Sequence, residues 1–165
     1  ESLQLKSLEQ SLTHHLDVGG LSVKIFGKVD RVDLVNGQCR IVDYKTGMVE
    51  TKDLSIASWE DLISNSNKSK ALQLMMYAYL YLKNNTEQTN AVVGNISFKN
   101  LKEGLLCIKQ KNSRKALMVG SYELQLFEEQ LKKLLLKIMD VEEPFVQTTK
   151  ISTCDWCDFK NLCGR

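Results

Sequence analysis

Asp43 and Lys45, one residue apart, are the side chains best suited to chemistry, and a predicted hairpin brings Asp30 to the same place. Runs rich in Val, Ile and Leu flank Asn36-Gly37, a dipeptide typical of two-residue hairpin turns because both residues tolerate positive φ. If these two residues form the loop, the register of the strands follows from it. The register places Asp30 opposite Asp43, Lys28 opposite Lys45, and Asp33 opposite Arg40.

Such a hairpin would hold two carboxylates about 5 Å apart at Cβ, with Lys45 on the same face one pleat away. Like charges directly opposite each other destabilise a hairpin, and carboxylates this close do not both ionise freely without a cation between them. A divalent ion with oxygen ligands would supply that charge. Asp30 and Asp43 are therefore candidate metal ligands. The alternative is an ordinary solvated face on which Lys28 and Lys45 neutralise the carboxylates.

A further polar pair, Gln73 and Tyr77, lies on an expected helix that Ser69 would cap and that runs from Lys70 to about Leu82. Residues four apart share one helix face. Such a pair on its own is more often packing than function, but it follows the carboxylate pair in sequence. Four apolar residues of the same helix are expected to bury against the sheet, namely Leu72, Met75, Met76 and Tyr79.

Residues 27–33, 41–47 and 73–77 together resemble the PD-(D/E)xK nucleases, specifically the RecB/AddB-type branch. The resemblance implies a restriction-endonuclease-like α/β fold, with a mixed central β-sheet flanked by α-helices. It also implies a Mg²⁺- or Mn²⁺-dependent deoxyribonuclease in which Lys45 orients the attacking water or balances charge at the scissile phosphate. The residues it assigns to metal binding are Asp30, Asp43 and the backbone carbonyl of Tyr44, and those bordering the active site are Gln73 and Tyr77.

Nucleases of this branch belong to DNA repair and recombination complexes, so the resemblance implies DNA and a helicase domain or subunit as partners. The family also has an upstream helix whose His or Glu completes the metal shell, and we expect that helix to be missing before Glu9. Whether the chain cleaves DNA by itself is therefore left open. The alternative function is a catalytically silent DNA-binding or structural module of such a complex.

The cysteines Cys154, Cys157 and Cys163 have the spacing Cys-x2-Cys-x5-Cys, in which the first pair can grip one ion or cluster. The tail resembles the C-terminal cluster of AddB-type and CRISPR-adaptation nucleases. That resemblance implies ligation of a [4Fe–4S] cluster, with a fourth cysteine that we expect outside this chain. The alternatives are three unmetallated thiols or a zinc-ribbon-like interaction segment. Cys39 and Cys107 are expected in the core.

The chain has 165 residues, 43% of them apolar and 25% charged, which is ordinary for one globular domain. Its net charge of +2 does not by itself indicate a nucleic-acid binder. No apolar run suggests a membrane span or signal peptide, so we expect a cytoplasmic location. We expect a nuclease core over 1–150 and a cysteine-rich tail over 151–165. The remaining expected elements are strands over 1–17, 21–30, 91–98, 105–110 and 116–119, and helices over 59–63 and 122–140.

Overall fold

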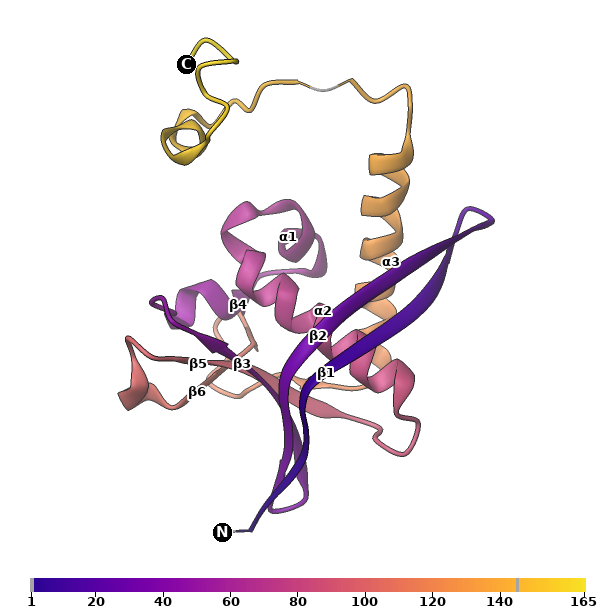
Figure 1. The fold of residues 1–165 in the computed structure, drawn as a ribbon, viewed down its shortest axis with the longest axis vertical. Helices are drawn as coiled ribbons and strands as arrows, with labels where there is room; N and C mark the ends of the chain where they lie inside the picture. Colours follow the sequence, from indigo (N-terminus) through magenta and orange to yellow (C-terminus); the bar gives the residue numbers. More distant parts are fainter. Residues whose placement is uncertain (1, 145) are drawn as a thin grey trace.

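The N-terminal half is built on one long hairpin and a shorter one that continues it. The computed structural model describes residues 2–144 and 146–165. Strands β1 (Leu3–Val18) and β2 (Leu21–Val35) are antiparallel and join at Gly19-Gly20, where both φ angles are positive. Strand β3 (Gln38–Lys45) follows Asn36-Gly37, whose φ angles are 50° and 83°. The predicted turn is therefore confirmed (Figure 1).

The central sheet has the order β1-β2-β3-β5-β6, and a short strand β8 pairs with β5. The three later strands are β5 (Ala91–Ser97), β6 (Leu105–Cys107) and β8 (Met118–Val119). Because β3 and β5 are parallel while the other pairs are antiparallel, the sheet is mixed. A separate parallel pair joins β4 (Ser55–Ile56) to β7 (Lys109–Gln110). The predicted mixed sheet flanked by helices is confirmed.

In the described residues, the α-helices beside the sheet are α1 (Trp59–Ser64), α2 (Ser69–Asn84) and α3 (Ser121–Met139). The 3-10 turn η2 (Ser66–Lys68) links α1 to α2. The other 3-10 turns are η1 (Thr51–Leu54) before β4, η3 (Leu101–Glu103) before β6 and η4 (Ile151–Trp156) after α3. The predicted cap of Ser69 on α2 is wrong, because Ser69 is already helical and its N–H donates to the carbonyl of Ser66. The preceding turn thus satisfies that backbone donor.

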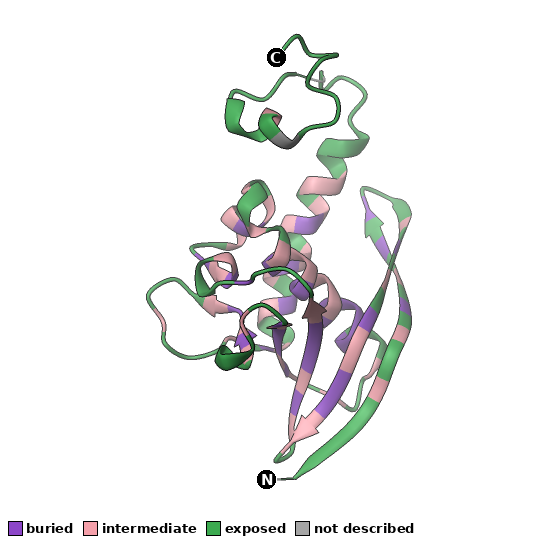
Figure 2. Ribbon diagram, turned by 60° about the vertical axis from the view of Figure 1, so that its left-hand side comes forward, coloured by how far each residue is buried: buried purple, intermediate pink, exposed green. Residues whose placement is uncertain are grey.

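Helix α2 supplies the centre of the core, lying across β1, β2, β3 and β5 (Figures 1 and 2). Met75 and Tyr79 are fully buried, as predicted, while Leu72 and Met76 are partly buried against the same cluster. Burying each large apolar side chain contributes about 1.5–3 kcal/mol. Gly27 of β2 lies under this helix, and a Cβ there would be 3.0 Å from Cδ1 of Leu80. The glycine therefore permits the close approach of α2 to the hairpin.

Helix α3 packs against the core as far as Leu135. Phe127 and Leu131 are buried, but Ile138, which the apolar stripe predicted in the core, is 68% exposed because the last turns of the helix extend past the sheet. Glu128 fastens the packed part to α2. Its carboxylate accepts from the Tyr79 hydroxyl at 2.9 Å and forms ion pairs at 2.9 Å with Lys83 and with Lys132. Burial would raise the pKa of Glu128, but these partners lower it to about 2.

Candidate active site

The β2–β3 register follows the prediction from Arg31–Val42 to Val35–Gln38, so Asp33 does face Arg40. It departs from the prediction at Asp30. In the described part of the chain Asp30 belongs to neither ladder of β2, and its Oδ2 instead accepts a hydrogen bond from the backbone N–H of Tyr44 at 2.9 Å. The carboxylate of Asp30 thus reaches the β3 backbone one residue beyond its predicted partner, Asp43.

The interruption at Asp30 coincides with a distortion in β1. Glu9, which lies between the residues that pair with Val29 and Arg31, has a positive φ of 51°. Its carboxylate forms an ion pair with Lys28 on the exposed side of the hairpin. Among the described residues the β2–β3 ladder does not reach Lys28 or Lys45, so their predicted pairing is wrong. Glu9 is the main cause that raises the pKa of Lys28, and the charge of Asp30 adds to it.

Asp43 is buried, with only 2% of its surface exposed, and two polar side chains contact its carboxylate. The ammonium of Lys45 lies 2.9 Å from Oδ2 and 3.2 Å from Oδ1, and Nδ2 of Asn95 donates to Oδ2 at 2.6 Å. Burial raises the pKa of Asp43, and the negative charge of Asp30 adds to this, whereas Lys45 and Asn95 oppose it. Nearby positive charge therefore stabilises the ionised form of the Asp43 carboxylate.

Lys45 is connected to α2 through the predicted pair on that helix. Its ammonium donates to Oε1 of Gln73 at 2.7 Å, and Nε2 of Gln73 donates to the hydroxyl of Tyr77 at 2.7 Å. The hydrogen bond to Tyr77 orients the Gln73 amide, and this amide orients the Lys45 ammonium. The ammonium therefore has a fixed direction between β3 and α2. The structure brings Asp43, Lys45, Gln73 and Tyr77 into one polar chain, with Asp30 beside it.

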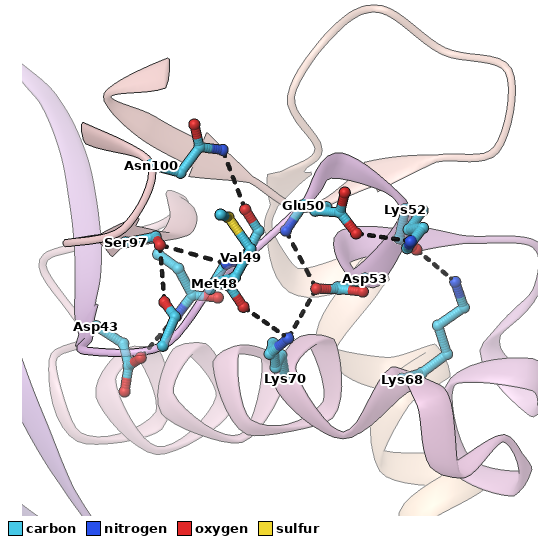
Figure 3. A network of polar contacts seen from close by, with 12 residues as sticks. Asp43, Met48, Val49, Glu50, Lys52, Asp53, Lys68, Lys70, Ser97 and Asn100 are labelled. Atoms are coloured by element: carbon cyan, nitrogen blue, oxygen red, sulfur yellow. Dashed lines mark hydrogen bonds and ion pairs between the residues drawn. The ribbon is translucent and has the colours of Figure 1, made fainter. Parts of the chain in front are cut away.

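The chain segment that leaves Lys45 is also fastened. The Ser97 hydroxyl donates to the carbonyl of Gly47 at 2.8 Å and accepts from the N–H of Val49 at 3.3 Å. Further along, the Lys70 ammonium donates to the carbonyl of Met48 at 3.2 Å and pairs with Asp53 at 2.7 Å (Figure 3). The loop after β3 therefore lies fixed over the first turns of α2.

Asn95 and Ser97 are the residues that the sequence analysis missed. Both are fully buried polar residues on β5, and the parallel register places Asn95 beside Asp43 and Ser97 beside Lys45. The Oδ1 atom of Asn95 is buried and has no hydrogen-bond partner among the described residues. The available signal was the alternation of these two polar residues in an otherwise apolar strand.

The opposite face of the hairpin has a structural ion-pair cluster. Asp33 is fully buried, with Arg31 at 2.6 Å and with Arg40 at 2.7 and 3.0 Å. Burial would raise the pKa of Asp33, but the two guanidinium groups lower it. Arg31 also donates to the Tyr44 hydroxyl at 3.1 Å. The Tyr44 side chain is thus engaged away from Asp43, and only its backbone is available to the site.

Residues 2–164 match the family model described as the PD-(D/E)XK nuclease superfamily. The chain belongs to this superfamily. The match identifies the superfamily as a whole, and the RecB/AddB-type branch stays a prediction. No curated protein matches the sequence.

One solved structure, titled "Crystal structure of SSO0001", is 16% identical with a TM-score of 0.45. The alignment covers 95% of this chain and 59% of that chain. The chain thus spans about three fifths of the length of the solved chain it matches.

PD-(D/E)XK nucleases usually use Mg²⁺ or Mn²⁺, and the donor set here fits such an ion. Among the described residues no group of three or more His, Cys, Asp or Glu side chains could hold a metal. Mg²⁺, however, is commonly bound through one or two carboxylates, with waters and substrate phosphates completing the shell. Asp30 and Asp43 supply that minimum. A ligand role for the Tyr44 carbonyl stays a prediction.

The cysteine-rich tail over 151–165 lies apart from the site around Asp43 and Lys45. Cys154, Cys157 and Cys163 are free thiols, the last two exposed, on and after η4. Cluster ligation by these residues stays a prediction. Cys39 is buried as predicted, and burial raises the pKa of its thiol to about 11, while Cys107 is only partly buried. Within residues 2–144 and 146–165, no helix is both long and apolar enough to span a bilayer.

Proposed function

We propose that this chain is a Mg²⁺- or Mn²⁺-dependent deoxyribonuclease domain that hydrolyses phosphodiester bonds, as exonuclease or endonuclease. One observation carries the proposal. The Lys45 ammonium is held between the Asp43 carboxylate and the Gln73 amide, at 2.9 and 2.7 Å. Such a buried acid–lysine pair, backed by a helix and beside a second carboxylate, is suited to hold a cation and a phosphate together.

Each residue of the site would have a separate role. Asp30 and Asp43 would hold the ion, which when bound lowers the pKa of a water and stabilises charge on the phosphate. Lys45 would orient that water or neutralise the scissile phosphate. Gln73 fixes the direction of the Lys45 ammonium, and Tyr77 fixes the amide of Gln73. A lysine held in this way loses little side-chain entropy when substrate binds.

The wider context is also part of the proposal. The order of the motifs and the spacing of the tail cysteines support a RecB/AddB-type domain of a cytoplasmic helicase–nuclease that acts in DNA repair or recombination. In this context the tail residues Cys154, Cys157 and Cys163 would join a cysteine from elsewhere in the complex to ligate a [4Fe–4S] cluster. Iron, sulfide and zinc analysis of anaerobically purified protein tests this, because a zinc site would contain no sulfide.

One observation favours the second candidate, a catalytically silent DNA-binding or structural module. Lys45 already contacts both oxygens of Asp43, at 2.9 and 3.2 Å. The acidic residue is thus neutralised by the chain itself, and a scaffold could keep this pair without any metal. The two candidates differ in whether Mn²⁺ can compete with the Lys45 ammonium for Asp43.

Calorimetric titration of Mn²⁺ into the chain and its Asp43→Ala variant tests the proposal. We expect saturable binding that the variant loses, together with cleavage of an end-labelled oligonucleotide. Lys45→Ala should abolish cleavage but leave Mn²⁺ binding largely intact. Asp17→Ala, which removes an exposed carboxylate at the far end of β1, is the matched control and should change neither.

Two results would decide against the nuclease. Retained cleavage in Lys45→Ala would remove that residue from the reaction. Absence of both Mn²⁺ binding and cleavage in the unmodified chain, with oligonucleotide binding preserved, would favour the silent module.

A further inference from the structure

We propose that a basic hollow between η1, η2 and the turn after β7 binds backbone phosphates of the nucleic acid that the active site would cleave. This inference rests on the proposed function and extends it to a second surface. The hollow has a volume of about 750 Å³. Its cationic side chains come from three separate parts of the sequence and are Lys52, Lys68, Lys109, Lys111 and Arg114.

The fold assembles this hollow through the small β4–β7 sheet. Ser55 pairs with Lys109 and Ile56 with Gln110, so the turn at 111–114 lies beside η1. Pairing with β4 adds the charges of this turn to those of Lys52 and Lys68. Like charges are thus concentrated on one surface, although the whole chain has a net charge of only +2.

The acidic residues near the hollow do not cancel this charge. Asp61 is the one carboxylate among its lining residues, and its pKa is lowered by the Asn65 amide at 3.0 Å and by nearby cations that include Lys68 and Lys111. Glu50, just outside, pairs with Lys52 at 2.6 Å. The remaining cationic side chains outnumber these acids, so an anion in the hollow would be attracted.

The rim of the hollow is held in position before any ligand binds. The N–H of Lys111 donates to the carbonyl of Ile56 at 2.7 Å, and the Lys68 ammonium donates to the carbonyl of Lys52 at 2.8 Å. Asn112 takes the positive φ of 67° that closes the turn. A pre-ordered rim reduces the entropy lost on binding.

A second hollow of about 620 Å³ continues from the first toward the active site. It shares Lys52, Asn65 and Lys68 with the basic hollow. It adds Lys70 together with Asp53, which pairs with the Lys70 ammonium at 2.7 Å. Figure 3 shows these lysines above the start of α2, with Lys70 between Asp43 and Lys68. Lys68 and Gln73 are separated by about 7.5 Å along the helix at 1.5 Å per residue. Phosphates in the hollow would thus lie a few nucleotides from Lys45, given about 3.4 Å of rise per phosphate on one strand.

The lining indicates recognition of the backbone rather than the bases. In the part of the chain that the structure describes, no aromatic side chain lines the basic hollow, so it offers no stacking surface. Apart from Asp61, its polar members are lysine, arginine, serine, threonine and asparagine, the groups that contact phosphate. Binding there should be independent of sequence and strongly dependent on salt.

The test is fluorescence anisotropy of a labelled single-stranded oligonucleotide of about 12 nucleotides, measured in EDTA over a series of KCl concentrations. The variant is Lys111→Gln with Arg114→Gln. The control is Lys24→Gln with Lys133→Gln, which removes the same charge from two exposed positions elsewhere. Each lost phosphate contact on a single strand changes the salt slope by about 0.7 and weakens binding about 5-fold at 0.1 M salt.

We therefore expect the hollow variant to bind about 25-fold more weakly at 0.1 M salt with a slope lower by about 1.4, and the control to bind like the unmodified chain. Equal losses in both variants, an unchanged slope, or no binding by the unmodified chain would overturn the proposal. Competition by polyglutamate as strong as that by the oligonucleotide would also overturn it, in favour of an acidic protein partner.

Cleavage measured on the same proteins separates this proposal from the nuclease assignment. Salt-dependent binding lost only in the hollow variant, without Mn²⁺-dependent cleavage by any protein, would refute the nuclease and keep the binding surface. Normal binding and cleavage by the hollow variant would refute the hollow and keep the nuclease.

Discussion

The substitution Asn95→Val tests whether β5 contributes to the acidic site or only to the core. The side chain is fully buried, donates to Asp43 at 2.6 Å through Nδ2, and has an Oδ1 atom without a partner among the described residues. Valine is apolar, suits a strand, and removes both polar atoms together. The substitution therefore separates a positioning role from a packing role.

The expected change in stability is small because two effects oppose each other. Loss of a hydrogen bond to a charged group costs about 1.5–3 kcal/mol, whereas removal of a buried acceptor without a partner recovers about 1–3 kcal/mol. The free energy of unfolding should thus change by no more than about 2 kcal/mol. Asp43, however, loses the neighbour that fixes its Oδ2. Loss of such an outer partner typically weakens metal binding about 10–100-fold.

The assay is Mn²⁺ calorimetry together with urea unfolding, with Ser97→Ala as the matched control. Ser97 is equally buried on the same strand but bonds to Gly47 and Val49 and not to Asp43. The control should lower the free energy of unfolding by about 1–3 kcal/mol and leave Mn²⁺ affinity nearly unchanged. Wild-type Mn²⁺ affinity in Asn95→Val would refute the positioning role, and equal affinity losses in both variants would indicate a general distortion of β5.

Three further outcomes are expected. Because the folded-state pKa of Glu128 is lowered to about 2, its contribution to stability is complete above the unfolded pKa of about 4.3 and is lost as the pH falls toward 2. Glu128→Gln should cost about 1.5–3 kcal/mol at pH 7 and flatten the acid limb of the stability profile in urea titrations, and an unchanged limb would contradict this. Gly94→Ala would place Cβ 2.5 Å from the backbone oxygen of Leu106. We expect the free energy of unfolding to fall by about 1–3 kcal/mol and the melting temperature to fall with it, and an unchanged melting temperature would show that β6 shifts freely. Tyr77→Phe removes the acceptor for the Gln73 amide and should slow cleavage about 10-fold while Mn²⁺ binding stays constant; full activity would remove Tyr77 from the site.

The predictable part of the site was set by local sequence. Asn36-Gly37 fixes a turn whose two positive φ angles determine the strand register, and the two-residue period then puts Asp43 and Lys45 on one face. The helical period likewise puts Gln73 and Tyr77 on one face of α2. These features depend on residues within a few positions of each other, so sequence alone could identify them.

The unpredicted part depends on contacts between distant segments. Asp30 leaves the ladder where β1 is distorted at Glu9, which no pattern within the β2–β3 hairpin reveals. Asn95 reaches Asp43 only because β5 lies parallel to β3 in one particular register, after a connection that contains α1 and α2. A shift of that register by one residue would turn Asn95 to the opposite face.

The contrast between local sequence features and contacts between distant segments explains why the acid–lysine motif is necessary but not sufficient for the proposed chemistry. The motif places Asp43 and Lys45 on one strand, yet their side chains are immobilised by Asn95 from β5 and Gln73 from α2. Removing the β5 neighbour should release Asp43, and removing the α2 neighbour should release Lys45. Metal binding depends on Asp43, and phosphate chemistry depends on Lys45. Substitution of Asn95 should therefore lower Mn²⁺ affinity, whereas substitution of Gln73 should lower the cleavage rate.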